Sequence, residues 1–242
     1  MRLAWLLVVL CVVLSALHAS ADEAEWKAHV DAGTSAYRAG DYQAATARFE
    51  AALREAESFA ASDRHLATSL NILALLYKEL GRYAEAEPLF RRSLEIDEKA
   101  LGPDHLSVGT TLNDLALLYN AQARYTEAEP LYRRSMAIRE KALGPEHLDV
   151  GRSLNNLAGL YRAQGRYAEA ESLYRRDLAI SEKALGLDHP SVGTALNNLA
   201  MLYKELGRYA EAEPLYRQSL GIYEKALGPD HRSVGTTLSN LA

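Results

Sequence analysis

Residues Leu112 to His147 read LNDLALLYNAQARYTEAEPLYRRSMAIREKALGPEH, and a close copy of this stretch follows 42 residues later. That copy, from Leu154 to His189, reads LNNLAGLYRAQGRYAEAESLYRRDLAISEKALGLDH, and another runs from Leu196 to His231. The block from Leu70 to His105 fits the same template. A fixed period of about 20 to 50 residues is typical of stacked repeat architectures. Such repetition builds an extended surface, whereas catalysis needs one asymmetric group of residues.

Each block contains the pattern of two helices. Leu112, Leu115, Ala116 and Tyr119 recur at i, i+3, i+4 and i+7, which places them on one face of a first helix. A second apolar pattern spans residues 128–136 and ends at Leu143-Gly144-Pro145. Glycine adopts the left-handed conformation after a helix, and proline cannot continue one. The block therefore predicts an antiparallel pair of helices.

The turn inside each block predicts one strained residue. Gly81, Gly165 and Gly207 precede Arg-Tyr in three blocks, but Ala123 takes this place in the fourth. If the position requires a positive φ, alanine is strained there.

Two further patterns recur along the helices. A tyrosine stripe, interpreted as core packing, comprises Tyr77, Tyr119, Tyr161 and Tyr203. Pairs such as Glu129/Arg133 and Glu171/Arg175 are spaced i, i+4 with the favourable polarity, and each contributes a few tenths of a kcal/mol. These pairs predict a solvated outer face.

A family resemblance follows from Leu199-Ala200, Tyr203, Gly207, Tyr209, Ala212 and Tyr216. This pattern resembles the tetratricopeptide repeat. The 42-residue period and the wording LNNLA…GRYAEAEPLYRRSL…EKALGPDH are similar to the kinesin-light-chain type of that repeat, from Asp63 to Ala242. The resemblance implies an all-α fold, a right-handed α-solenoid of stacked antiparallel helix pairs. It also implies a non-enzymatic scaffold whose partners are proteins or peptides.

The repeats divide the chain into segments. Residues 22–62 carry a weaker match and predict a degenerate terminal repeat, 63–230 hold four repeats, and 231–242 begin an incomplete one. Such arrays generally need a polar capping helix for solubility. Residues 231–242 therefore indicate either a truncated product or an edge that pairs with another chain. Self-assembly through that edge is the alternative function.

Residues 1–21 have the layout of a secretory signal peptide. Arg2 is followed by the apolar run from Leu3 to Leu17 and by Ala19-Ser20-Ala21, a small-residue cleavage pattern. The alternative is an uncleaved membrane anchor, although a spanning helix needs about 20 apolar residues. We expect a periplasmic or secreted protein that does not contact the membrane after cleavage. The single cysteine, Cys11, lies within the removed segment.

Composition excludes one class of partner. The formal net charge of the whole chain is −5, with 32 acidic and 27 basic side chains. Nucleic acid is therefore not expected as a partner, because its phosphates require a basic face.

The resemblance also implies a binding groove, since first helices line the concave side of tetratricopeptide arrays. The groove-facing asparagines expected on this basis are Asn71, Asn113, Asn155 and Asn197, with Asn156 and Asn198 at the groove edge. An amide both donates and accepts hydrogen bonds, so it can bind a peptide backbone of any sequence. The alternatives are hydrogen bonds to a neighbouring repeat, or inheritance by duplication without a role.

Basic residues are expected beside these asparagines. Lys78, Arg152, Arg162 and Lys204 fall on the same face of the first helices. They favour a peptide with acidic residues or a free carboxylate. The alternative is that they are solvated and have no role in binding.

The sequence offers no constellation for catalysis, a metal or a cofactor. A histidine recurs after an acidic residue at His105, His147, His189 and His231, at the loop that opens each first helix. One histidine per repeat does not supply the ligands that a zinc ion needs. We interpret these pairs as structural, because negative charge suits a helix N-terminus.

Overall fold

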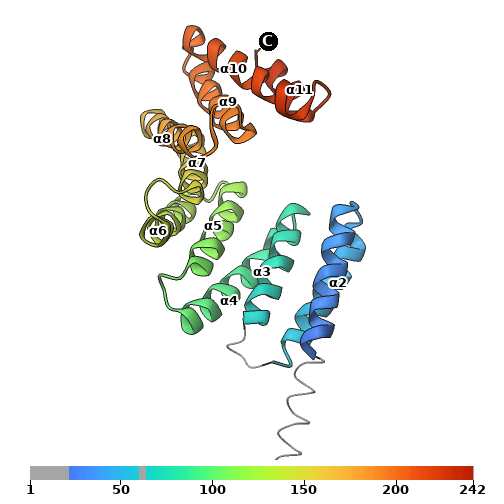
Figure 1. Ribbon diagram of the computed structural model, residues 1–242. Helices are drawn as coiled ribbons and strands as arrows, with labels where there is room; N and C mark the ends of the chain where they lie inside the picture. Colours follow the sequence, from blue (N-terminus) through green and yellow to red (C-terminus); the bar gives the residue numbers. More distant parts are fainter. Residues whose placement is uncertain (1–21, 60–63, 242) are drawn as a thin grey trace, which may run out of the picture. The chain divides into compact units, whose positions relative to one another are not determined.

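The computed structural model describes residues 22–59 and 64–241, and the ordered elements in those ranges are all α-helices (Figure 1). The all-α fold is therefore confirmed. No helix in the described ranges is both long enough and apolar enough to cross a membrane. The predicted signal peptide, residues 1–21, lies outside the described residues. The predicted repeat limits at 62, 63 and 230 stay predictions.

The chain forms two compact units, one ending at Thr111 and the other beginning at Leu112. The first contains helical residues 22–38, α2 (Tyr42–Ala56), α3 (Arg64–Glu79), α4 (Tyr83–Leu101) and the start of α5 (Leu106–Ala121). Helix α3 packs against both α2 and α4. Leu66, Leu70 and Ile96 form its core, and Trp26 packs against them. The Trp26 Nε1 donates a hydrogen bond of 2.8 Å to the Ser69 Oγ, which ties residues 22–38 to α3.

The second unit continues the same pattern. After the rest of α5 come α6 (Tyr125–Leu143), α7 (Leu148–Ala163), α8 (Tyr167–Leu185), α9 (Pro190–Glu205), α10 (Tyr209–Leu227) and α11 (Arg232–Leu241). From α6 onward each helix packs against the next. Buried layers repeat with the sequence period: Val150, Leu154 and Ile180 form one, and Val192, Leu196 and Ile222 form the next. Stacked helix pairs are thus confirmed within this unit.

The turn between α5 and α6 confirms the strain expected at Ala123. Its φ is +56°, and it is the one non-glycine residue with a positive φ in the described ranges. Gly165, at the same place between α7 and α8, has a φ of +73°. Both backbones are left-handed, which glycine adopts without the clash that a Cβ causes.

The recurrent histidines cap the first helices, as the structural interpretation requires. The His147 Nδ1 accepts a hydrogen bond of 3.1 Å from the Asp149 backbone N–H, and the His189 Nδ1 accepts one from Ser191. His105 and His231 do the same for Ser107 and Ser233. The capping group is the imidazole itself, whereas the sequence pointed to the carboxylate before it.

The tyrosine stripe is buried, as predicted, and it contributes polar contacts as well. Tyr77, Tyr119, Tyr161 and Tyr203 are 3 to 7% exposed. In the second unit the Arg166 guanidinium lies 3.9 Å from the centre of the Tyr161 ring. The Arg208 guanidinium stacks on Tyr203 in the same way. This cation–π geometry stabilises the turn that follows each first helix.

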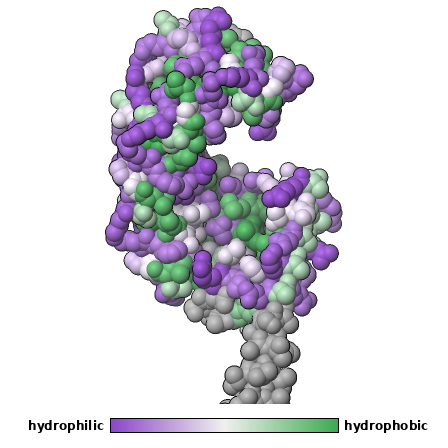
Figure 2. Space-filling model, in the orientation of Figure 1, coloured by the Kyte–Doolittle hydropathy of each residue, from purple (hydrophilic) through white to green (hydrophobic). Residues whose placement is uncertain are grey.

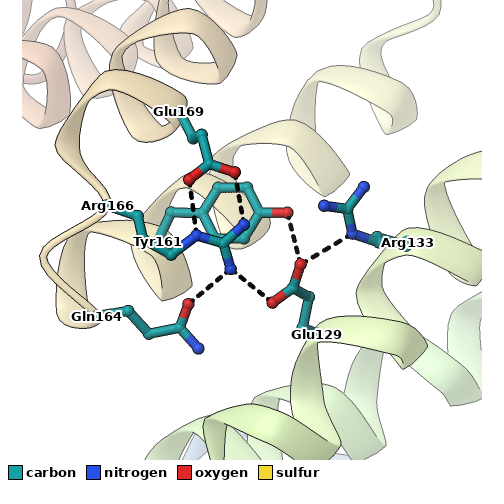
Figure 3. A network of polar contacts seen from close by, with 6 residues as sticks. All are labelled: Glu129, Arg133, Tyr161, Gln164, Arg166 and Glu169. Atoms are coloured by element: carbon teal, nitrogen blue, oxygen red, sulfur yellow. Dashed lines mark hydrogen bonds and ion pairs between the residues drawn. The ribbon is translucent and has the colours of Figure 1, made fainter.

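The predicted outer face of i, i+4 pairs is more than a solvated surface (Figure 3). The Glu129 carboxylate of α6 accepts hydrogen bonds from the Tyr161 hydroxyl at 3.0 Å and from the Arg166 Nη1 at 2.7 Å, in addition to Arg133. Glu171 of α8 binds Tyr203 and Arg208 with the same geometry. We call this the glutamate clasp. It joins α6 to the pair α7–α8, and α8 to the pair α9–α10. The sequence interpretation missed it because the partners lie 32 to 37 residues apart.

Candidate functional site

A cavity of about 340 Å³ lies among α7, α8 and α9 of the second unit. Its walls come from the first helices α7 and α9 and from the second helix α8. The lining residues are Leu148, Arg152, Asn155, Asn156, Asp177, Ser181, Leu185, Ser191 and Thr194. Three of the predicted groove residues are therefore brought together here: Arg152, Asn155 and Asn156.

The first unit holds the equivalent cavity two periods earlier. It has a volume of about 210 Å³, and its lining includes Arg64, Thr68, Asn71, Ser93 and Asp97. Asn71 is thus also at a cavity wall. The same opening recurs because the same three-helix arrangement recurs. The two units therefore have cavities at equivalent positions that are lined by different side chains.

The predicted asparagines form hydrogen-bonded pairs between successive first helices. The Asn156 Nδ2 donates to the Asn113 Oδ1 at 2.9 Å, and the Asn198 Nδ2 donates to the Asn155 Oδ1 at 2.8 Å. Asn197 receives a bond of 3.2 Å from Asn240 in the same way. In the first unit the Asn71 Nδ2 donates to Thr111.

This geometry matches the alternative in which the amides join neighbouring repeats, and it leaves binding capacity. In the described part of the chain, the Asn155 and Asn197 amide nitrogens have no hydrogen-bond acceptor. Each therefore keeps two N–H donors. Peptide contact by these groups stays a prediction.

The expected basic groove is largely paired within the protein. Arg152 binds Asp149 at 2.8 Å, Arg162 binds Glu205, and the Lys204 Nζ donates to the Asn240 carbonyl at 2.6 Å. No partner of Lys78 is found among the described residues. Two of the four cations, Arg152 and Arg162, are thus balanced by a carboxylate. The sequence interpretation missed the Arg162 pair because Glu205 lies 43 residues away.

The sequence interpretation missed two positions on the second helices, one helical turn apart. The first carries Ser93, Ser135, Asp177 and Ser219, and the second carries Asp97, Arg139, Ser181 and Tyr223. In the two cavities they form the wall opposite the first helices. The signal was available in the aligned blocks. Ile96 and Glu98 are the same in all four blocks, whereas the first position is serine or aspartate and the second is acidic, basic, hydroxyl or aromatic.

The two buried aspartates differ in their surroundings. Asp97 and Asp177 are each 7% exposed. Burial raises the pKa of Asp97, and the nearby His105 and Arg64 charges oppose that rise. Burial raises the pKa of Asp177 to about 7, opposed only by a hydrogen bond from the Ser181 hydroxyl. Of these two aspartates, Asp177 is therefore the one whose carboxylate is not stabilised by a cation among the described residues.

The visible surface of the molecule carries both hydrophilic and apolar residues. Figure 2 shows hydrophilic residues over much of the visible face, interrupted by smaller apolar patches. Arg152, Ser191 and Thr194 are exposed at the rim of the α7–α9 cavity. A ligand entering there meets hydroxyl, amide and charged groups before it reaches Asp177.

Comparisons with known proteins agree on the repeat. The tetratricopeptide repeat model matches residues 26–99, 65–141, 107–183, 150–225 and 191–242. The nearly identical TPR-like repeats described for a kinesin light chain of Podosopora anserina share 28% identity and a TM-score of 0.70, over 83% of this chain and 96% of that one. BtubC (BKLC) from P. vanneervenii shares 21% identity and a TM-score of 0.70, over 88% of this chain and 95% of that one. No curated protein sequence matches the chain.

Proposed function

This chain belongs to the tetratricopeptide repeat family, with repeats like those of kinesin light chains, and we propose that it binds a segment of a partner protein along its first helices. The fold is typical of scaffolds for protein–protein interaction. The observation that carries the proposal is the cavity that opens between α7 and α9 and recurs in the first unit. An extended segment lying across these helices would place side chains in such cavities.

The groups at the cavity suit a peptide. The Asn155 amide keeps its donors, and the Ser191 and Thr194 hydroxyls lie at the rim. Peptide backbones offer alternating donors and acceptors that such groups can bind. The role is therefore proposed to be binding without catalysis.

Selection of peptides from a randomised library on the folded protein tests the proposal. Ser191→Trp fills the cavity mouth at an exposed position, and Ala179→Trp places the same ring on the opposite surface between α8 and α10. We expect Ser191→Trp to lower the affinity of the selected peptides by about 10-fold or more, while Ala179→Trp leaves that affinity unchanged. Equal effects of both variants, or an effect of Ala179→Trp alone, would contradict binding along the first helices.

We further propose that the scaffold works outside the cytoplasm. The support is the sequence of residues 1–21, with its apolar run and small-residue cleavage pattern. The chain purified from the periplasm or medium of an expressing bacterium should begin at Asp22. Recovery with Met1 in the cytoplasmic or membrane fraction would contradict this.

Self-association through residues 231–242 stays the alternative. Leu238 of α11 is 47% exposed and would supply an apolar contact. Light scattering over a concentration series, with the wild type and Leu238→Glu, tests it. A mass that rises with concentration in the wild type alone would support self-association, and a constant monomer mass in both would exclude it.

A further inference from the structure

The two variable positions on the second helices determine what each cavity offers to a ligand. At the first position Ser93 donates its hydroxyl to the Ala67 carbonyl at 2.9 Å, and Ser219 donates to the Gly193 carbonyl at 2.7 Å. Serine thereby closes the gap between its second helix and the preceding first helix. Asp177 holds the equivalent place in α8, and an ionised carboxylate cannot donate such a bond.

The Asp177 carboxylate lies close to α7. A methyl group placed on Gly151 would lie 2.8 Å from the Asp177 Oδ1, so the carboxylate occupies the space beside that glycine. The side chain is 7% exposed and lines the α7–α9 cavity. A buried carboxylate costs free energy unless a positive group or several donors compensate it.

Within residues 22–59 and 64–241, no cation favours the ionised form of Asp177. In the first unit Arg64 lines the cavity with Asp97, and its charge favours the ionised carboxylate. In the second unit the position of Arg64 is taken by Leu148. The nearby Arg152 is 75% exposed and paired with Asp149, and the His189 Nδ1 caps α9. The cavity thus keeps a buried acid whose counter-charge is missing.

The remaining lining suits an organic cation. Asn156, Ser181, Ser191 and Thr194 add amide or hydroxyl oxygens around the carboxylate. An ammonium group has three donors and a guanidinium has five, and both need several acceptors when they leave water. Leu148 and Leu185 supply apolar surface for the methylene stem of such a side chain.

We propose that the α7–α9 cavity binds a lysine or arginine side chain of the partner segment, with the Asp177 carboxylate as its ion-pair partner. This inference rests on the proposed function and specifies the chemistry of the bound segment at one point. It also reverses the preference for acidic peptides that the sequence predicts from the basic residues of the first helices.

Peptide selection on the wild type and on Asp177→Ser tests the proposal. Serine is the residue that the other blocks carry at this position, so the variant keeps a side chain that the fold accommodates. We expect wild-type selections to enrich a basic residue at one peptide position, and Asp177→Ser selections to lose that enrichment. For one selected peptide, Asp177→Ser should weaken binding by about 30-fold or more, because it removes one partner of a buried charge pair.

A substitution in the peptide completes a double-mutant cycle with Asp177→Ser. Replacing the enriched basic residue by norleucine should cost the same factor on the wild type and little on Asp177→Ser. Peptides that bind along the first helices without a basic preference would overturn this inference and leave the proposed function standing. If Ser191→Trp does not weaken the binding of the selected peptides, both this inference and the proposed function are overturned.

Two further readouts separate the remaining explanations. The ¹³C resonance of the Asp177 carboxyl should show an ionised group at pH 5 in the peptide complex. A carboxyl that stays protonated in the complex would overturn the ion pair. n-Butylammonium chloride should compete only at millimolar concentration, and competition as tight as the peptide would show a free amine site instead.

Discussion

At Ala123 the turn between α5 and α6 takes a left-handed backbone that the corresponding turns give to glycine. Ala123→Gly removes the Cβ that disfavours this conformation. We expect the free energy of unfolding in urea to rise by about 1 kcal/mol, since the left-handed region costs other residues about 1 to 2 kcal/mol. Gly165→Ala is the matched reverse change and should lower it by a similar amount. A lower free energy of unfolding in Ala123→Gly would contradict the assignment of backbone strain to Ala123.

The tyrosines on the second helices provide a contrast between a paired and an unpaired hydroxyl. The Tyr132 hydroxyl is buried and has no hydrogen-bond partner among the residues that the structure describes, whereas the Tyr174 hydroxyl interacts with Arg162. Phe90 occupies the equivalent place in α4. Tyr132→Phe should raise the free energy of unfolding by about 1 kcal/mol, and Tyr174→Phe should lower it by about 1 kcal/mol. Equal effects of the two changes in thermal or urea unfolding would contradict the assignment.

Residue-scale features differ in how far the sequence predicts them. Ala123 stood out because one turn lacked the glycine of its copies, and the buried tyrosine stripe followed from helical spacing. Asp177 also differs from its copies, which are serines, but that difference alone does not show a role. Its importance depends on what lies across the cavity, and the loss of a neighbouring cation at Leu148 becomes visible only in the structure.

At the scale of elements, the glutamate clasp connects α6 and α8 each to the helix pair that follows, and Figure 3 shows it for Glu129 of α6. Burial opposes ionisation of Glu129, but hydrogen bonds from Arg166, Arg133 and Tyr161 outweigh it and hold the pKa of this carboxyl below its ordinary value. Glu129→Gln should lower the free energy of unfolding by about 1.5 to 3 kcal/mol at pH 7, the usual contribution of hydrogen bonds to a charged group.

The matched control for that prediction is Glu213→Gln. Glu213 binds Arg217 within α10 and is 57% exposed, so its loss should cost a few tenths of a kcal/mol. Folding lowers the pKa of Glu129, so the ionised carboxylate stabilises the fold fully only above its unfolded-state pKa. The effect of Glu129→Gln should therefore vanish as the pH falls through the folded-state pKa. A pH-independent effect in urea unfolding would contradict the role of the ionised carboxylate.

Helices and their order were predictable at this scale, but their lateral connections were not. Apolar spacing and the Gly-Pro signals identify both helices of a block from local sequence alone. The asparagine pairs and the clasp join residues about one period apart, so several pairings fit the same spacing. Only the structure shows that Asn155 accepts from Asn198 and that Glu129 reaches Arg166.

At the scale of the whole molecule, Asp177 makes stability depend on pH. Since burial raises its pKa to about 7, the folded protein holds a proton that the unfolded protein releases between about pH 4 and 7. Stability should therefore fall as the pH rises through this range. Asp177→Ser should raise the free energy of unfolding at pH 8 by up to about 4 kcal/mol, at about 1.4 kcal/mol per pKa unit. The gain should shrink toward pH 4.

Urea unfolding of the wild type and Asp177→Ser across pH 4 to 8 checks this prediction. Asp97→Ser is the comparison, because Arg64 and His105 already favour the ionised form of Asp97. At pH 8, Asp97→Ser should raise the free energy of unfolding by less than Asp177→Ser does. Parallel stability curves for the wild type and Asp177→Ser would show that the buried acid carries no cost.

Amide chemical-shift mapping with a selected peptide would show, residue by residue, whether a partner segment lies along the first helices of the repeat array. We expect the largest shifts in α7 and α9, at Arg152, Asn155, Ser191 and Thr194, together with Asp177 and Ser181 on the cavity wall. Shifts concentrated on the opposite surface, at Ala179 of α8 and Leu215 of α10, would contradict binding along the first helices.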